Sequence, residues 1–163
     1  MPDMPFQRAL RNSVQEVLEK MFFVEPLEEP PAEAESPDEE MAVQLAFDGV
    51  PSGALTLRVS NAAARQIAAD FLGEDESGLC SGQVEEVVRE LANMICGSVL
   101  SRVESTATFR LSPPRLLVPR EGQNRQEAAE LRAVHAVAIG SGTLTASVET
   151  RDPVCPAVEK SAS

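Results

Sequence analysis

Two side chains that could take part in chemistry lie on one line of a strongly apolar segment, residues 83–102. Glu90 is followed three residues later by Asn93, and Gly97 follows after four more. At about 100° of rotation per residue, these positions and Glu86 fall within a sector of roughly 80° on a helix. A carboxylate can hold a cation and an amide can both donate and accept hydrogen bonds. Side chains three residues apart lie about 5 to 6 Å from each other, so Glu90 and Asn93 could act on one partner site.

The rest of this segment predicts a buried helix that presents a single polar line. The positions outside that line are mostly apolar: Val84, Val87, Val88, Leu91, Met94, Ile95, Val99 and Val103. Glycine is unfavourable inside a helix, and Gly97 stands where another surface could come close to Asn93. The simpler interpretation is a solvated face, with Glu90 loosely paired to Arg89 or Arg102 and Asn93 a surface amide.

The other elements must hold this helix in place. Apolar residues at helical spacing predict a helix over 6–23. We expect hairpins from 41–47 with 54–59 and from 134–139 with 143–148, the second around Gly140, Ser141 and Gly142. A helix over 62–72 starts after the N-cap pair Ser60 and Asn61 and ends at Gly73. Short strands are expected at 106–111 and 115–118, followed by a polar loop over 120–132. The order predicts an α+β fold, an antiparallel sheet with the long helix and two further helices packed against it.

Length and charge bound the class of protein. The 163 residues favour a single domain over 1–150, which can fold without disulfides or metal, and a disordered tail over 151–163. The formal net charge is −12, but 25–40 holds seven Glu, one Asp and no Lys or Arg. Without that stretch 18 acids stand against 14 bases, a net of −4. The stretch is predicted to be a solvated acidic loop. Nucleic acid is a poor candidate partner, because clustered Lys and Arg are lacking.

Other common kinds of site find little support in the sequence. Three cysteines without close pairing, Cys80, Cys96 and Cys155, argue against a disulfide framework and favour a reduced compartment. No leader or spanning segment is recognisable, so we expect a cytoplasmic protein that does not cross a membrane. His135 is the one histidine, which does not support a metal site. We expect no metal and no cofactor on this chain, and the polar line remains the candidate for chemistry.

The run from Glu90 to Gly97, E-L-A-N-M-I-C-G, resembles the E-x-x-N signature of the CheC/CheX/FliY chemotaxis phosphatases, and is most similar to CheX-like domains. The N-terminal helix, the hairpin and the closing strands extend the resemblance over 6–149. It implies removal of the phosphoryl group from the aspartyl phosphate of a CheY-like response regulator. Asn93 would then orient the attacking water, while Glu90 pairs with a lysine of the partner. Mg²⁺ would belong to the partner's site.

The resemblance gives the neighbouring positions roles as well, and it has limits. Glu86 would contribute to docking and Gly97 would give a partner close approach. CheC-like members carry two signatures, but the first helix here offers 16–19, E-V-L-E, without an asparagine, which implies a single site. CheX-like relatives form dimers through their sheets, so a homodimer is a further expectation. The alternative function is a noncatalytic adaptor of the same fold that binds a receiver or a flagellar-switch-like protein.

Overall fold

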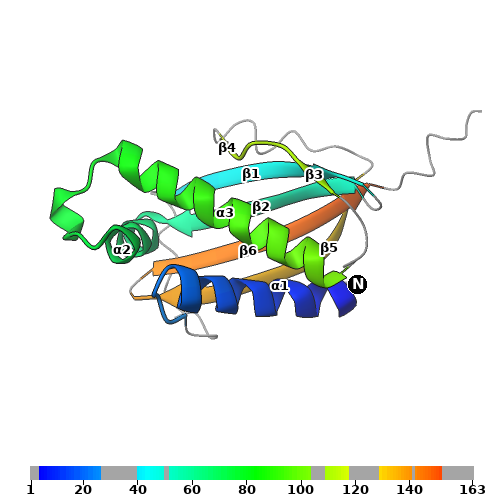
Figure 1. Ribbon diagram of the computed structural model, residues 1–163, viewed down its shortest axis with the longest axis horizontal. Helices are drawn as coiled ribbons and strands as arrows, with labels where there is room; N and C mark the ends of the chain where they lie inside the picture. Colours follow the sequence, from blue (N-terminus) through cyan, green and yellow to red (C-terminus); the bar gives the residue numbers. More distant parts are fainter. Residues whose placement is uncertain are drawn as a thin grey trace, which may run out of the picture.

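The computed structural model describes residues 4–26, 40–49, 52–103, 109–117, 129–140 and 142–151. Three α-helices cover one face of a six-stranded antiparallel sheet, so the predicted α+β class is confirmed (Figure 1). The helices are α1 (Met4–Glu16), α2 (Asn61–Leu72) and α3 (Ser81–Val103), with a π-helical turn η1 (Val17–Met21) and a 3-10 turn η2 (Glu76–Gly78). The strands are β1 (Glu40–Asp48), β2 (Ser52–Ser60), β3 (Arg110–Leu111), β4 (Arg115–Leu116), β5 (Ala129–Ile139) and β6 (Gly142–Arg151).

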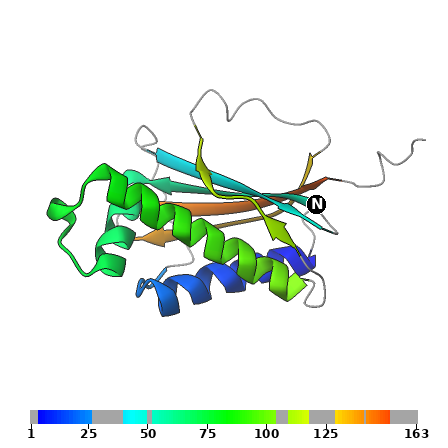
Figure 2. The same ribbon diagram turned by 45° about the horizontal axis from the view of Figure 1, so that its top comes forward.

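The sheet has the order β3-β1-β2-β6-β5, and β4 also pairs with β1. Both predicted hairpins are present, because β1 pairs with β2 and β5 with β6, each antiparallel. Gly140 in the second turn has φ +59°, a left-handed conformation that glycine adopts without strain. The two short strands β3 and β4 run along the outer edge of β1 (Figure 2). The other edge of the sheet is β5.

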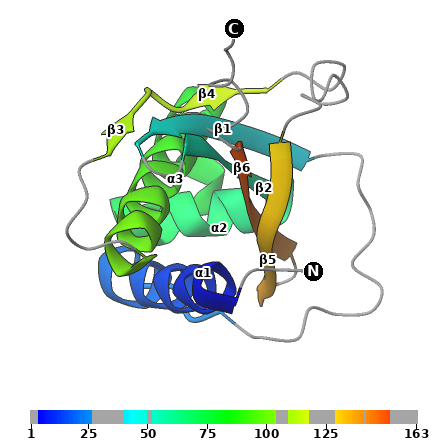
Figure 3. The same ribbon diagram turned by 90° about the vertical axis from the view of Figure 1, so that its right-hand side faces the viewer.

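The core lies between the helices and the facing side of the sheet (Figure 3). Alternate residues of the central strands are buried, as expected where one face of a sheet is covered. They include Val43, Leu45 and Phe47 of β1, Leu55, Leu57 and Val59 of β2, and Leu144, Ala146 and Val148 of β6. Opposite them α3 buries nine side chains: Val84, Val87, Val88, Leu91, Ala92, Ile95, Cys96, Val99 and Leu100. The prediction of a buried helix over 83–102 is therefore confirmed.

Polar contacts with α1 fix the rotation of α3 about its own axis. The Ser13 hydroxyl donates to the Ser98 hydroxyl at 2.9 Å, and Ser13 is fully buried. Arg102, one turn after Ser98 on α3, extends this contact. It donates to the Ser98 hydroxyl at 3.3 Å and also forms an ion pair with Glu16 of α1. A hydroxyl pair inside an apolar interface accepts little rotation, since turning either helix would leave a buried polar group unsatisfied.

The sheet edge at β5 is also held by α1. The Gln7 side-chain Nε2 donates to the Val134 carbonyl at 2.7 Å, and the Val134 N–H donates to Gln7 Oε1 at 3.2 Å. One amide side chain therefore satisfies both main-chain groups of this edge residue.

Several predicted boundaries differ from the structure. The helix predicted over 6–23 ends in η1, and Phe23 follows with φ 59°. Within the described residues, the strands predicted at 106–111 and 115–118 are two-residue pairings on either side of two prolines, and 106–108 and 118 lie outside the described ranges. The loop predicted over 120–132 is wrong at its end, because β5 begins at Ala129 and pairs with β6 through a bulge between Leu131 and Ala133. The bulge interrupts the alternation by which a strand is recognised.

Two predictions fall largely on residues outside the described ranges. Most of the acidic loop expected over 25–40 lies there, and so does the tail beyond Arg151. Arg151 itself ends β6 and pairs with Ser52, so the strand reaches one residue into the expected tail.

Candidate functional site

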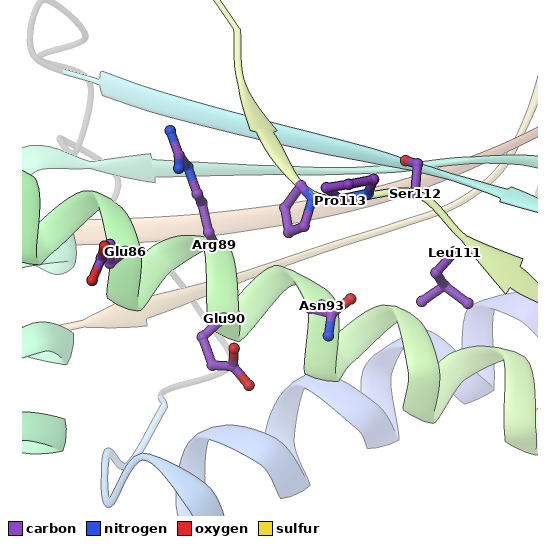
Figure 4. A pocket seen from close by; sticks show the side chains of 8 residues that line it. Glu86, Arg89, Glu90, Asn93, Leu111, Ser112 and Pro113 are labelled. Atoms are coloured by element: carbon purple, nitrogen blue, oxygen red, sulfur yellow. The ribbon is translucent and has the colours of Figure 1, made fainter.

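An open groove of about 590 Å³ runs between α3 and the segment that joins β3 to β4 (Figure 4). One wall, the proline wall, consists of the last residue of β3 and the next three residues of the chain, two of which are prolines. The other wall is the polar line of α3. The lining residues are Glu86, Arg89, Glu90, Asn93, Leu111, Ser112, Pro113 and Pro114.

The proline wall is fastened to β1. The Ser112 N–H donates to the Ala46 carbonyl at 2.9 Å, and the Ala46 N–H donates to the Ser112 hydroxyl at 2.8 Å. Beyond the prolines, the Leu117 N–H donates to the Ala42 carbonyl at 2.8 Å. Proline has no N–H to give to a sheet, so Pro113 and Pro114 divide this edge pairing into β3 and β4. The wall is consequently part of the sheet edge rather than a separate loop.

Three of the four predicted site residues meet in this groove. Glu86 and Glu90 are exposed, and Asn93 is half-buried at the foot of the helix wall. Gly97 lies one turn further along α3 and does not line the groove. A Cβ atom placed on Gly97 would have no neighbour within 4 Å, so its surroundings are open space.

The start of α3 is set by a side chain of its first turn. Gln83 Oε1 accepts from the Cys80 N–H at 2.9 Å, as the third residue of a capping box does. This contact satisfies an amide that the helix itself cannot pair. It also sets where along the helix the positions Glu86, Glu90 and Asn93 fall relative to the proline wall.

The simpler interpretation of Glu90 as half of an ion pair finds no support in the described residues. Arg102, one of the two cations considered for it, pairs with Glu16 of α1 instead. No ion pair joins Glu90 to Arg89 within the described part of the chain. An exposed carboxylate in a groove is thus available to a cation from outside.

Sequence reasoning missed the second wall and Arg89 as a lining residue. The adjacent prolines Pro113 and Pro114 were the available signal, because a proline pair in a strand-like run indicates a bend at a sheet edge. What the sequence could not indicate is that this bend lies opposite Asn93. That juxtaposition depends on the pairing of Ser112 with Ala46, which is 66 residues away.

The groove can bind and orient, but its lining residues include no strong nucleophile. The buried Cys96 lies on the core side of α3, and burial raises the pKa of its thiol to about 12, which keeps it protonated.

No cluster of three metal-ligating side chains occurs among the residues that the structure describes. None of the described helices is long and apolar enough to cross a membrane. Glu90 offers an anionic acceptor and Asn93 a neutral donor and acceptor, one turn apart.

A protein-family model and several solved structures resemble the chain. The family model described as chemotaxis phosphatase CheX matches residues 41–135. The chemotaxis protein CheX of Vibrio vulnificus is similar in structure, with a TM-score of 0.69, 19% identity, and coverage of 88% of this chain and 94% of that one. CheX in the CheX-CheY-BeF3-Mg complex of Borrelia burgdorferi has a TM-score of 0.66 and 18% identity, covering 91% and 97%.

A third solved structure shares the fold as well. FliY of Thermotoga maritima has a TM-score of 0.53 and 15% identity, covering 88% of this chain and 85% of that one. At these identities the solved structures establish the fold alone. No curated protein sequence matches the chain.

Proposed function

The chain belongs to the chemotaxis phosphatase CheX family, and from this membership we propose that it hydrolyses the aspartyl phosphate of a CheY-like receiver protein. The observation that carries the proposal is the position of Glu90 and Asn93 in one open groove, side by side on α3. The Borrelia burgdorferi relative forms a complex with CheY, BeF3 and Mg.

Asn93 is the residue that positions the water that attacks the phosphorus atom. Its amide accepts a hydrogen bond from a water and holds that water in line with the bond between phosphorus and the aspartyl oxygen. The water oxygen forms the new bond to phosphorus as the bond to the carboxyl oxygen breaks. The products are the free aspartate carboxylate, hydrogen phosphate, and one proton released to solvent. Phosphoryl transfer depends mainly on positioning and charge stabilisation, so a neutral amide suffices.

Glu90 sets the docking register. Its exposed carboxylate pairs with the lysine of the receiver site, about one helical turn from the water held by Asn93. A carboxylate at position 93 would instead repel the phosphoryl oxygens. Glu86, one turn before Glu90, adds a peripheral acidic contact, and the open space at Gly97 admits the receiver's backbone.

The second candidate is a noncatalytic adaptor. The similarity to Thermotoga maritima FliY fits this candidate too, because the two proteins share a fold over 88% of this chain and a shared fold alone does not require hydrolysis. As an adaptor the chain would use the same groove to hold a receiver or a flagellar-switch-like protein without accelerating hydrolysis.

The decay of phosphorylated receivers from the host tests the two candidates. We expect the wild-type chain to accelerate the decay. N93A should lower that acceleration by a factor on the order of 100, while receiver binding persists. E90A is expected to weaken binding of the same receiver. Asn61 and Glu85 provide matched controls, because N61A and E85A change the same residue types outside the groove. No acceleration by the wild type over the host's receivers, or full activity of N93A, would refute the catalytic function.

A further inference from the structure

Arg89 lines the groove beside Asn93, yet the function proposed above gives it no role. Its Nε atom is buried and has no hydrogen-bond partner among the described residues. Buried donors in native proteins are nearly always satisfied, so an ordered water or a group that binds in the groove would supply the acceptor for this guanidinium N–H.

Arg89 and Asn93 lie on the same side of α3 and line the same groove. Arg89 precedes Asn93 by four residues, so the two side chains stand about one turn apart on nearly the same face. Viewed down the helix, Asn93 lies between Arg89, about 40° to one side, and Glu90, about 60° to the other. Figure 4 shows the Arg89 side chain rising beside Pro113 while the Glu90 carboxylate points away from it. The groove therefore offers a cation on one side of Asn93 and an anion on the other.

The surroundings keep this charge available. No ion pair joins Arg89 to Glu86 or Glu90 within the described part of the chain, although both carboxylates line the groove. Leu111, Pro113 and Pro114 place apolar groups along the opposite wall. Their carbon atoms displace water, and a charge interaction strengthens as the local dielectric constant falls. A planar guanidinium presents its N–H groups as a fork that fits two oxygens of a phosphoryl group.

We propose that Arg89 is a third functional residue of the groove, and that its guanidinium donates hydrogen bonds to the phosphoryl oxygens of the receiver's aspartyl phosphate. This inference rests on the proposed function. Negative charge spreads over those oxygens as the bond from phosphorus to the carboxyl oxygen breaks, and a fixed cation at that point stabilises the transition state. Arg89 makes no bond and transfers no proton. Glu90 binds the lysine, Asn93 places the water and Arg89 holds the phosphoryl group.

Steady-state dephosphorylation over a range of receiver concentrations separates this role from docking. With a phosphorylated receiver that the wild type dephosphorylates, R89M is expected to lower kcat on the order of 100-fold with a smaller change in KM. R89K should fall between wild type and R89M, because lysine keeps the charge but lacks the fork. R58M is the matched control, since Arg58 is exposed on β2 outside the groove. Circular dichroism confirms that each variant folds. An unchanged kcat with a raised KM in R89M would overturn the proposal and make Arg89 a docking contact.

A second measurement needs no receiver. The Nε–H resonance of Arg89, assigned by its loss in R89K, is followed by ¹H–¹⁵N NMR during titration with inorganic phosphate. A sodium chloride titration at equal ionic strength is the reference. We expect phosphate to shift this resonance and chloride to leave it in place, with a larger response in E90Q, where one repelling charge is gone. An unresponsive resonance overturns the assignment of Arg89, whatever the dephosphorylation assay gives. A clear phosphate response in a protein that accelerates no receiver would keep the Arg89 contact and refute the phosphatase function.

Discussion

Asn93 and Gly97 lie one helical turn apart on α3, and a methyl group added to Gly97 would meet no neighbour within 4 Å. The described part of the chain thus offers no packing reason for a glycine at this position. Glycine inside a helix is less favourable than alanine by about 1 kcal/mol. The proposed function gives one reason for a glycine here, which is close approach of the receiver to Asn93.

G97A is therefore expected to change stability and function in opposite directions. The free energy of unfolding in urea should rise by about 1 kcal/mol, because alanine favours the helix and its methyl group enters open space. Binding of the receiver should weaken, because the same methyl group takes up space on the docking face. Gly82 is the matched control, since it is also in α3 and also has no neighbour within 4 Å. Undiminished receiver binding by G97A would show that Gly97 does not face the partner.

The proline wall should loosen when its hydroxyl anchor is removed. In S112A the Ala46 N–H loses the acceptor that it contacts at 2.8 Å, and we expect the free energy of unfolding to fall by about 1–2 kcal/mol. Hydrogen exchange should increase at Ala46. Ser147, half-buried in β6 and outside the groove, provides the comparison variant S147A. Equal protection of Ala46 in S112A and wild type would contradict the anchoring role.

The buried thiol of Cys96 should make stability fall at alkaline pH. Its pKa rises from 9.0 to about 12 on folding, because burial disfavours the thiolate. Between these values the unfolded chain has released the proton that the folded protein retains, so the unfolded state binds fewer protons. The free energy of unfolding then decreases as pH rises, by about 1.4 kcal/mol per pH unit. Below pH 9.0 this contribution is fully present.

Urea unfolding between pH 8 and 11 measures this slope. C96A should show a shallower decrease than wild type over the same range, since it has no thiol to ionise at this site. The exposed Cys80 is kept in both proteins. Identical slopes would mean that Cys96 ionises equally well in the folded state.

Ser60 joins α2 to the second hairpin, so its loss should affect two elements together. Its hydroxyl oxygen accepts from the Ala63 N–H at 3.3 Å, as an N-cap does, and from the Thr143 N–H at 3.0 Å. S60A is expected to lower the free energy of unfolding by about 1–2 kcal/mol, because both amides lose their acceptor. S101A, at an exposed position of α3, should change it little. A loss no larger than that of S101A would refute the shared cap.

Local patterns were sufficient to predict much of the fold. The period of apolar residues over 83–102 predicted α3 and the face that presents Glu90 and Asn93, because burial of one side follows directly from side-chain spacing. The cap at Ser60 and the stop at Gly73 were predictable for the same reason, since capping involves neighbours in sequence. The resemblance to the E-x-x-N signature supplied the family, which the family model confirms.

Features that depend on distant pairing could not be predicted in this way. The wall that includes Pro113 faces Asn93 because Ser112 pairs with Ala46 in β1, a contact without a local sequence signal. The start of β5 at Ala129 was missed because the bulge near Leu131 breaks the alternating pattern. The roles of Glu90, Asn93 and Gly97 remain predictions that the variants above test, and the role of Glu86 remains a prediction as well.

The two hydrogen bonds between the Gln7 side chain and the main chain of Val134 affect how copies of the chain can associate. An unpaired strand edge is a template for intermolecular sheet extension, and proteins commonly obstruct such edges. At β1 the edge is taken by β3 and β4, while at β5 the amide of Gln7 occupies both main-chain groups of Val134. A homodimer built by adding a strand at Val134 would first have to displace this side chain. Helix α1 thus obstructs sheet extension at this residue of β5.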